Sequence, residues 1–240
     1  RTEGLQVKEN EKSFYWHGRY HNDMNSRDTI TTELNVFENF DPVIPDSYQP
    51  ADYLMLGNIL PSLQMKVLER LEKRPKLIVM DTMNLWIDIA KEELLKVIAK
   101  VDVLSINDEE ARQLTGEHFL VKAARAIMAT GPAFLIIKKG EHGALLFNKD
   151  QVFFAPALPL EEVFDPTGAG DTFAGGFIGY IAKTGDSSFE NMKKAVIHGS
   201  AMASFCVEKF GTQRLENLTP ADMQHRLEEF INLSRMESLL

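Results

Sequence analysis

From about residue 51 onward, short apolar runs alternate with stretches whose hydrophobic positions follow helical spacing. The apolar runs are YLMLG (53–57), KLIVM (76–80), VDVLSI (101–106) and AFLIIK (133–138). The helical segments between them lie at about 61–72, 91–99, 108–115 and 118–130. Strands and helices that alternate in this way predict βαβ units around a parallel sheet, whose ligands bind at the carboxyl ends of the strands.

The pattern changes after residue 143. ALLFN (144–148) and QVFFAP (151–156) predict a β-hairpin whose turn lies at 148–150. Three further helices are predicted at about 170–184, 188–207 and 219–236.

The first 36 residues differ from the rest because they are rich in aromatic and β-branched residues. SFYWHGRY and DTITTELNVF predict extended strands, and the polar stretch HNDMNSR predicts the loop between them. We therefore divide the chain into a β-rich segment, 1–36, and an α/β core, 37–240.

The amino-acid composition and net charge argue against several classes of binding partner. The chain is 44% hydrophobic, which is enough for a substantial core, and its net charge of −9 disfavours nucleic acid or an anionic membrane as a partner. The single cysteine, Cys206, excludes an intrachain disulfide and fits a reducing cytoplasm. No apolar run approaches the ~18 residues of a membrane span, and the six histidines show no metal-ligand spacing. We expect a cytoplasmic protein that binds a small molecule.

The stretch FDPTGAGDTFAGGF (164–177) combines glycines and aspartates before an apolar run. Gly168 and Gly170 allow close approach of the backbone, and a helix that begins near Gly170 would present free N–H groups to an anion. Asp171 then lies in the first turn of that helix, beside the anion. From the spacing alone, this carboxylate either accepts a proton from a nucleophile or caps the helix.

Two more polar stretches follow predicted strands. Asn107 and Glu110, in SINDEEARQLTG, share a helix face and could hold a hydrated Mg²⁺, but Asn-x-x-Glu is also the pattern of a capping box. Lys138, Gly140 and Gly143, in KKGEHGA, could approach a nucleotide, but an exposed turn between two strands has the same composition.

A fourth stretch, DTMNLW (81–86), places Asp81 and Asn84 at the end of the strand KLIVM. Both are polar groups at the edge where ligands bind, and Asp is also a routine residue at a helix start. The sequence leaves the roles of both residues open.

The order of these motifs is more specific than any one of them. Asn-x-x-Glu, then Lys-x-Gly-x-x-Gly, then DPTGAGD at a helix start resembles the ribokinase-like (PfkB-type) carbohydrate kinases over essentially the whole chain. Within them, the sequence is most similar to a subgroup of uncharacterised bacterial sugar kinases. The resemblance implies a three-layer α/β/α fold with a mostly parallel central sheet, and a small β lid formed by residues 1–36.

The resemblance also implies an activity: ATP-dependent phosphorylation of a hydroxymethyl group on a sugar or sugar-like substrate. Asp171 resembles the catalytic base that takes the proton from the substrate hydroxyl as it attacks the γ-phosphoryl group. The backbone N–H groups that would form the anion hole belong to Gly168, Ala169 and Gly170.

The remaining motifs then have implied ligands. Asn107 and Glu110 match the magnesium and phosphate motif. The residues that match the nucleotide-binding positions are Lys138, Gly140 and Gly143 for phosphates and ribose, and Ser200, in HGSAMASFCVEKFGTQ, for adenine. Asp165 matches a residue that helps to bind an activating K⁺ in some family members.

Two alternatives remain open. Phe14, Tyr15, Trp16 and Tyr20 in the lid could stack on a nucleobase, which would make the substrate a nucleoside, or they could serve lid packing or a dimer contact. A protein that binds a nucleotide without catalysis is the second alternative.

The sequence departs from the family pattern at its start. The opening strand with a substrate-binding aspartate, and the diglycine segment after it, do not precede Arg1. We therefore expect the N-terminal part of the fold to be absent from these 240 residues. Lid strands of this kind often pair between subunits, so a homodimer through the lid is also expected.

Overall fold

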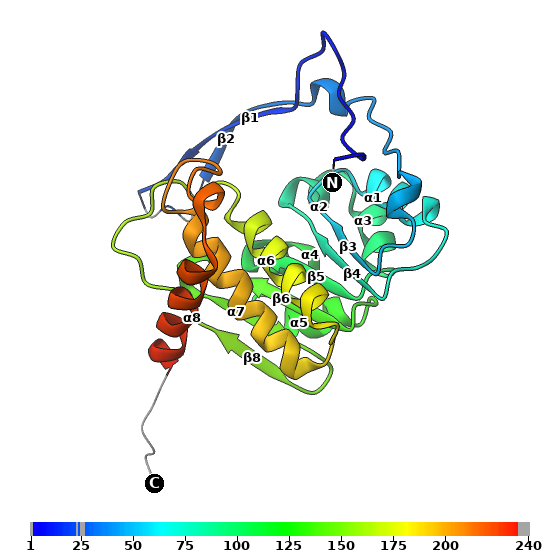
Figure 1. The fold of residues 1–240 in the computed structure, drawn as a ribbon. Helices are drawn as coiled ribbons and strands as arrows, with labels where there is room; N and C mark the ends of the chain where they lie inside the picture. The colour runs from blue at the N-terminus through cyan, green and yellow to red at the C-terminus, as the bar shows by residue number, and fades with distance from the viewer. Residues whose placement is uncertain (1, 23, 25–26, 235–240) are drawn as a thin grey trace.

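The fold contains one six-stranded sheet and one two-stranded sheet (Figure 1). The computed structural model describes residues 2–22, 24 and 27–234. In the large sheet, four parallel strands are followed by two antiparallel ones, in the order of the sequence. These strands are β3 (Tyr53–Leu56), β4 (Leu77–Asp81), β5 (Val103–Asn107), β6 (Phe134–Lys138), β7 (Ala144–Phe147) and β8 (Val152–Ala155). The predicted βαβ units and the hairpin are confirmed.

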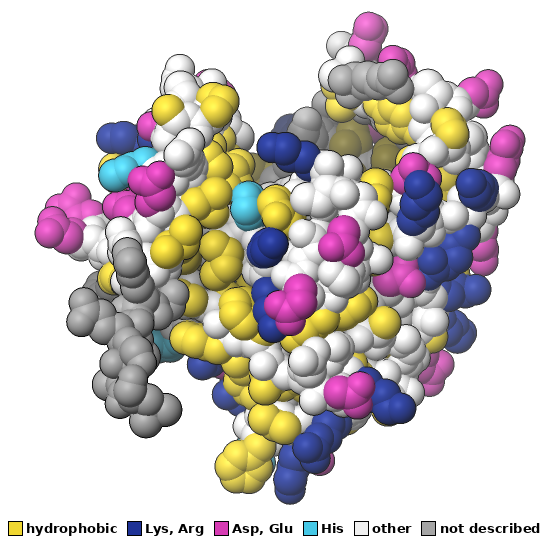
Figure 2. Space-filling view, turned by 60° about the horizontal axis from the view of Figure 1, so that its bottom comes forward, with side chains coloured by type: hydrophobic (Ala, Val, Ile, Leu, Met, Phe, Trp, Pro, Cys, Tyr) yellow, Lys and Arg dark blue, Asp and Glu magenta, His cyan; other side chains and the backbone are white. Residues whose placement is uncertain are grey.

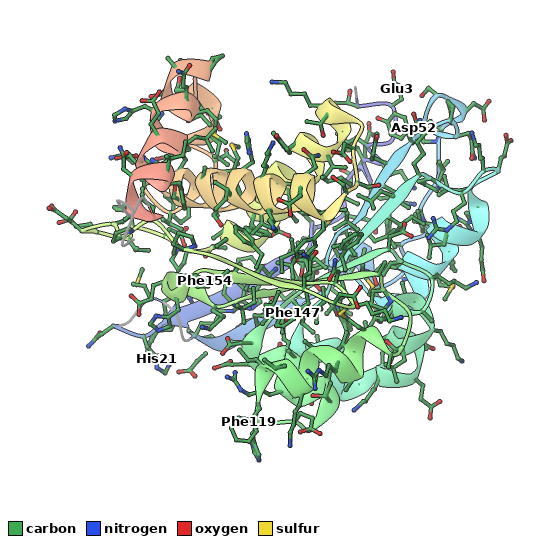
Figure 3. The ribbon with its side chains drawn as sticks, turned by 90° about the horizontal axis from the view of Figure 1, so that it is seen from below. Glu3, His21, Asp52, Phe119, Phe147 and Phe154 are labelled. Atoms are coloured by element: carbon green, nitrogen blue, oxygen red, sulfur yellow. The ribbon has the colours of Figure 1, made fainter. Side chains whose placement is uncertain are left out.

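Helices cover both faces of this sheet, which gives three layers (Figure 3). One face carries α1 (Pro61–Arg70), α2 (Asn84–Ile89), α3 (Lys91–Ile98), α4 (Asp108–Thr115) and α5 (Leu120–Met128). The other face carries α6 (Ala169–Thr184) and α7 (Phe189–Cys206), and α8 (Pro220–Ser234) packs against α7. Among the described residues of the core, the short helix α2 is the one α-helix that the sequence pattern did not predict.

The direction of side chains along β4 decides which layer each residue meets. Successive side chains of a strand point to opposite faces. Leu77 and Val79 pack in the core under α6 and α7, whereas Ile78 and Met80 pack in the core on the other face. Asp81, two residues after Val79, therefore lies on the face that α6 covers.

Two glycines allow α6 and α7 to pack closely. A Cβ atom on Gly199 of α7 would lie 2.7 Å from the carbonyl oxygen of Phe173, and one on Gly176 of α6 would lie 2.9 Å from Cγ of Met202. Any larger residue would push the helices apart. Gly176, the last residue of DPTGAGDTFAGG, therefore serves helix packing.

The small sheet pairs β1 (Tyr15–Tyr20) with β2 (Arg27–Glu33) in antiparallel register. The sequence predicted that the second strand would continue to residue 37, which is wrong. The strand ends at Glu33, and Asn35 adopts a left-handed conformation with φ +48°. The chain then turns so that Phe37 stacks on Phe14, with ring centroids 5.3 Å apart. Pairing of this sheet between two subunits stays a prediction.

The surface carries charges of both signs. On the face in Figure 2, acidic and basic side chains are interspersed among hydrophobic ones. Phe119, at the start of α5, points away from the molecule and is 70% exposed (Figure 3). Within the part of the chain that the structure describes, no helix combines the length and hydrophobicity that a membrane span requires.

Candidate active site

Three neighbouring parallel strands end in a polar residue. Asp81 is the last residue of β4, Asn107 of β5 and Lys138 of β6. The start of α6 adjoins this edge, because a Cβ atom on Gly170 would lie 3.3 Å from Nζ of Lys138 and 4.0 Å from Oδ2 of Asp81. The tertiary structure thus brings together residues that are far apart in the sequence, at the edge where α/β sheets bind ligands.

The first turn of α6 contains Asp171, whose position relative to the N-cap the structure defines. The N-cap is Gly168, in a left-handed conformation with φ +83°, and no side chain caps this end of the helix. Asp171 is the third helical residue, so it is an acidic residue of the first turn and not the N-cap. Its carboxylate accepts a hydrogen bond from the backbone amide of Asp171 itself and none from the side chain of another described residue. The residue as a whole belongs to the exposed class.

Backbone N–H groups at this helix start are available to an anion. The amides of Gly168 and Gly170 make no backbone hydrogen bond to any other described residue, whereas the amide of Ala169 donates to the carbonyl oxygen of Pro166 at 3.1 Å. Free amides at the positive end of a helix dipole favour a phosphoryl group. Of the three predicted donors, Gly168 and Gly170 are therefore better placed than Ala169.

The surroundings of Asp171 alter its acidity. Desolvation raises the pKa of its carboxyl group above the ordinary value, the nearby negative charge of Asp81 raises it further, and the positive charge of Lys138 lowers it. A carboxylate whose pKa is shifted toward neutrality is a stronger base, which suits proton abstraction.

The loop before α6 is fixed by contacts to both the lid and α7. Oδ1 of Asp165 accepts a hydrogen bond from the amide of Thr167 at 2.9 Å, and the amide of Asp165 donates to the carbonyl of Val207. The hydroxyl of Thr167 donates to the phenolic oxygen of Tyr20 in β1 at 3.1 Å. The thiol of Cys206 donates to the carbonyl of Thr167 at 3.7 Å. The lid therefore contacts the loop directly, and K⁺ binding by Asp165 stays a prediction.

Asn107 and Glu110 form the capping box that the sequence allowed. Oδ1 of Asn107 accepts from the amide of Glu110 at 2.7 Å, and Oε2 of Glu110 accepts from the amide of Asn107 at 3.0 Å. The other carboxylate oxygen of Glu110 accepts no hydrogen bond from a described residue. This single free carboxylate oxygen fits a Mg²⁺ ion that keeps most of its waters. Among the described residues, no three Asp, Glu, His or Cys side chains form a metal cluster.

The pKa of Glu110 is raised to about 6, mainly by burial of its carboxyl group. The hydrogen bond from the amide of Asn107 and the positive charges of Lys138 and Arg27 lower this pKa, whereas the negative charge of Asp81 raises it. The ordinary pKa of this group is 4.5, so the folded state holds the proton more tightly than the unfolded state. Ionisation of Glu110 therefore costs stability as the pH rises from about 4.5 to about 6.

Replacing Glu110 by glutamine should remove this cost. We expect the free energy of unfolding of Glu110→Gln, relative to the unaltered chain, to rise by about 2 kcal/mol between pH 4 and pH 7. Urea denaturation at both pH values measures the difference. A relative stability that does not change with pH would show that Glu110 ionises normally in the folded protein.

The turn after β6 gives Gly143 a packing role. A Cβ atom on Gly143 would lie 2.1 Å from the carbonyl oxygen of Ala155, at the end of β8. Gly140 begins the short turn with φ +54°, and Ser200 is half-buried on α7. Nucleotide contacts for Gly140, Gly143 and Ser200 stay predictions.

Asp81 is the residue of this site whose role the sequence left open. It is 4% exposed, and its carboxylate oxygens accept hydrogen bonds from Nζ of Lys138 at 2.9 and 3.1 Å. Its position at the end of a fully buried strand was the available signal. Asn84 is different: it is exposed at the start of α2, where its side chain accepts from the amide of Leu85.

Several curated proteins are similar in sequence. The cytidine kinase of Thermococcus kodakarensis is 32% identical over 171 residues, which is 70% of this chain and 59% of that protein. The nucleoside kinase of Methanocaldococcus jannaschii is 32% identical over 124 residues, or 52% of this chain and 38% of that protein. The deoxyribokinase of Salmonella typhi is 38% identical over 120 residues, or 48% of this chain and 37% of that protein. The chain thus spans less than two thirds of each relative.

Solved structures show the same fold. The nucleoside kinase of M. jannaschii, described as an archaeal member of the ribokinase family, superposes with a TM-score of 0.71 at 24% identity, over 92% of this chain and 70% of that one. The ribokinase of Arabidopsis thaliana gives 0.68 at 23% identity, over 91% and 70%. The sequence pattern described as "pfkB family carbohydrate kinase" matches residues 6–219. With that match over most of its length and the ribokinase-like fold, the chain belongs to the pfkB family of carbohydrate kinases.

Proposed function

We propose that this chain is an ATP-dependent phosphotransferase that phosphorylates a hydroxymethyl group of a sugar or sugar-like substrate. The observation that carries the proposal is the start of α6, where the carboxylate of Asp171 lies in the same helical turn as the free amides of Gly168 and Gly170. A base next to an anion site is what the transfer of a phosphoryl group to a hydroxyl requires.

In the proposed reaction, Asp171 accepts the proton of the substrate hydroxyl. The hydroxyl oxygen forms a bond to the γ-phosphorus of ATP while the bond to the β-phosphate oxygen breaks, and ADP leaves. The amides of Gly168 and Gly170 donate to the transferring group, and the Lys138 ammonium is close enough to contribute positive charge. Because these groups are held by the sheet edge and the helix start, they need little rearrangement as charge develops.

Glu110, with Asn107 beside it, would hold Mg²⁺ through water near the phosphates. When bound, the ion would neutralise phosphate charge. The contribution of the chain itself is the buried position of Glu110, 5% exposed and oriented by the capping box.

The direct test is a substrate panel. Pentoses, hexoses and nucleosides are assayed for ADP release with ATP and Mg²⁺, and Asp171→Asn serves as the background control. We expect turnover with at least one sugar-containing substrate. Binding of ATP measured by calorimetry, with no turnover on any panel member, would contradict the proposal and favour a non-catalytic nucleotide-binding protein.

A nucleoside is the second candidate substrate, because β1 carries Trp16 on the same face as Tyr20, which contacts the loop before α6. The edge of the Trp16 ring lies 2.2 Å from the position that a Cβ atom on Gly18 would take, so the ring lies across the glycine. Its Nε1 donates to Oγ1 of Thr29, and Tyr20 on the same strand face contacts Thr167. The relatives named cytidine kinase and nucleoside kinase support this candidate.

Replacing Trp16 by alanine separates the two candidates. If a nucleobase stacks on the ring, Trp16→Ala should raise the KM for a nucleoside about tenfold, which corresponds to about 1.4 kcal/mol, and leave the KM for a free pentose nearly unchanged. The matched control is Tyr15→Ala, because Tyr15 is 50% exposed on the opposite face of β1. Equal changes for both substrates would indicate that Trp16 only stabilises the lid.

A further inference from the structure

The ion pair between Asp81 and Lys138 is the most deeply buried one among the described residues. The side chains are 6% and 19% exposed, respectively. Both carboxylate oxygens of Asp81 accept from Nζ of Lys138, at 3.1 and 2.9 Å, and Oδ1 also accepts from the amide of Thr82. A lysine ammonium has three N–H donors. The bonds to Asp81 leave at least one donor over and restrict how the ammonium can turn.

The pair lies directly beside the start of α6. Asp81 lies on the face of β4 that α6 covers, and a Cβ atom on Gly170 would be 3.3 Å from Nζ of Lys138. Ser105, which is paired with Asp81 in the register of β4 and β5, is 1% exposed, and its hydroxyl has no hydrogen-bond partner among the described residues. The sheet edge beneath the anion site is thus a buried polar layer.

Stability alone does not account for such a pair. Burying two charges costs desolvation energy that their attraction often only balances, so a buried ion pair is weak evidence for a stabilising role. A carboxylate close to a phosphate site also repels the ligand. Both costs are offset if the carboxylate has a task at the site.

We propose that Asp81 is a positioning residue for phosphoryl transfer, which holds the Lys138 ammonium beside the first turn of α6 so that its remaining N–H donor faces a phosphoryl oxygen. The inference rests on the proposed kinase function. Asp81 acts through Lys138 and need not touch the substrate itself.

The charges around the base support this arrangement. The described charged groups that shift the pKa of Asp171 are Asp81, from β4, which raises it, and Lys138, from β6, which lowers it. The pair therefore contributes two opposite charges near the base. Removing either partner leaves the charge of the other uncompensated. The two substitutions should therefore shift the pKa of Asp171 in opposite directions.

A double-mutant cycle tests the positioning role. Asp81→Asn keeps the shape of the side chain and should lower kcat by about 10–100-fold, because a small misplacement of a positioned group costs rates of this order. In a Lys138→Met background, the same substitution should change kcat by no more than about threefold, since the residue through which it acts is absent. Asp52→Asn is the control, because it breaks the solvent-exposed Asp52–Lys76 pair and should leave kcat unchanged.

The pH dependence of kcat/KM provides a readout that a structural role would not move. The acid limb should shift to lower pH in Asp81→Asn and to higher pH in Lys138→Met, because Asp171 loses a negative neighbour in the first and a positive one in the second. Independent, multiplicative effects on kcat, with an unchanged acid limb in both variants, would overturn the proposal.

Lysine acylation tests the contact between Asp81 and Lys138 without a measurement of turnover. Brief treatment with acetic anhydride, followed by mass spectrometry, measures the labelling rates of Lys138 and of its neighbour Lys139. We expect Lys138 to be labelled several-fold faster in Asp81→Asn, with Lys139 unchanged. Equal labelling of Lys138 in both proteins would overturn the proposal. If the unaltered chain phosphorylates no panel member, the kinase function fails, and the labelling still decides whether Asp81 holds Lys138.

Discussion

Replacing Asp171 by asparagine is expected to lower turnover by about 10²–10⁴-fold, the usual worth of a positioned general base. The fold should be retained, because the carboxylate makes no hydrogen bond to the side chain of another described residue and Asp171 is not the N-cap of α6. The raised pKa means that the folded protein holds the proton more tightly than the unfolded chain, so ionised Asp171 costs stability at neutral pH. The variant should therefore unfold at the same temperature as the unaltered chain or at a higher one.

Steady-state assays on an active substrate, combined with thermal unfolding, measure both effects. The matched control is Glu190→Gln, because Glu190 is also an acidic residue in the first turn of a helix, α7, and its side chain is 74% exposed, with an ion pair to Lys193. Loss of this charge at a helix N-terminus costs a few tenths of a kcal/mol and should not change turnover. Near-normal turnover of Asp171→Asn would exclude Asp171 from the mechanism.

Replacing Gly143 by alanine is expected to cause the largest loss of stability. Gly143 has φ +78° and ψ −149°, a region of backbone conformation that only glycine adopts readily. The new Cβ atom would lie 2.1 Å from the carbonyl oxygen of Ala155 and 3.0 Å from the amide nitrogen of Ala157. Both neighbours are backbone atoms, so they cannot rotate away. Backbone strain and overpacking together should cost about 3–5 kcal/mol.

Gly116→Ala separates these two causes. Gly116 also has a positive φ, +74°, at the C-terminal end of α4, but a Cβ atom there would meet nothing within 4 Å. This variant should lose only the cost of a left-handed residue, about 1–2 kcal/mol. Urea denaturation of both variants gives the comparison. Equal losses would show that the contact with Ala155 has no energetic consequence.

The predictions from sequence were most accurate where one local pattern determines one element. The strand at Leu77–Asp81 is a run of buried apolar residues, and α6 is an apolar stretch that follows glycines, so both could be located from neighbouring residues alone. The prediction failed at the end of β2. There, the positive φ of Asn35 and the stacking of Phe37 on Phe14 end the strand, although the residues themselves favour extension.

At the candidate site, too, some features could be predicted from the sequence and others depended on the tertiary structure. The order of Asn107, Lys138 and Asp171 along the chain was enough to suggest a phosphate site. Whether Asp171 is the N-cap of its helix depended on where α6 begins, and the structure places the N-cap at Gly168.

The sequence by itself determined the alternation of strands and helices and the residues that stand at the carboxyl ends of the strands, because both depend on spacing along the chain. Only the tertiary structure decided that Asp81 holds Lys138, that the hydroxyl of Tyr20 meets Thr167, and that Ala169 uses its amide within the turn. Asp81 and Lys138 are 57 residues apart in sequence. Their contact exists because parallel strands bring their ends to one edge, which no local pattern of residues records.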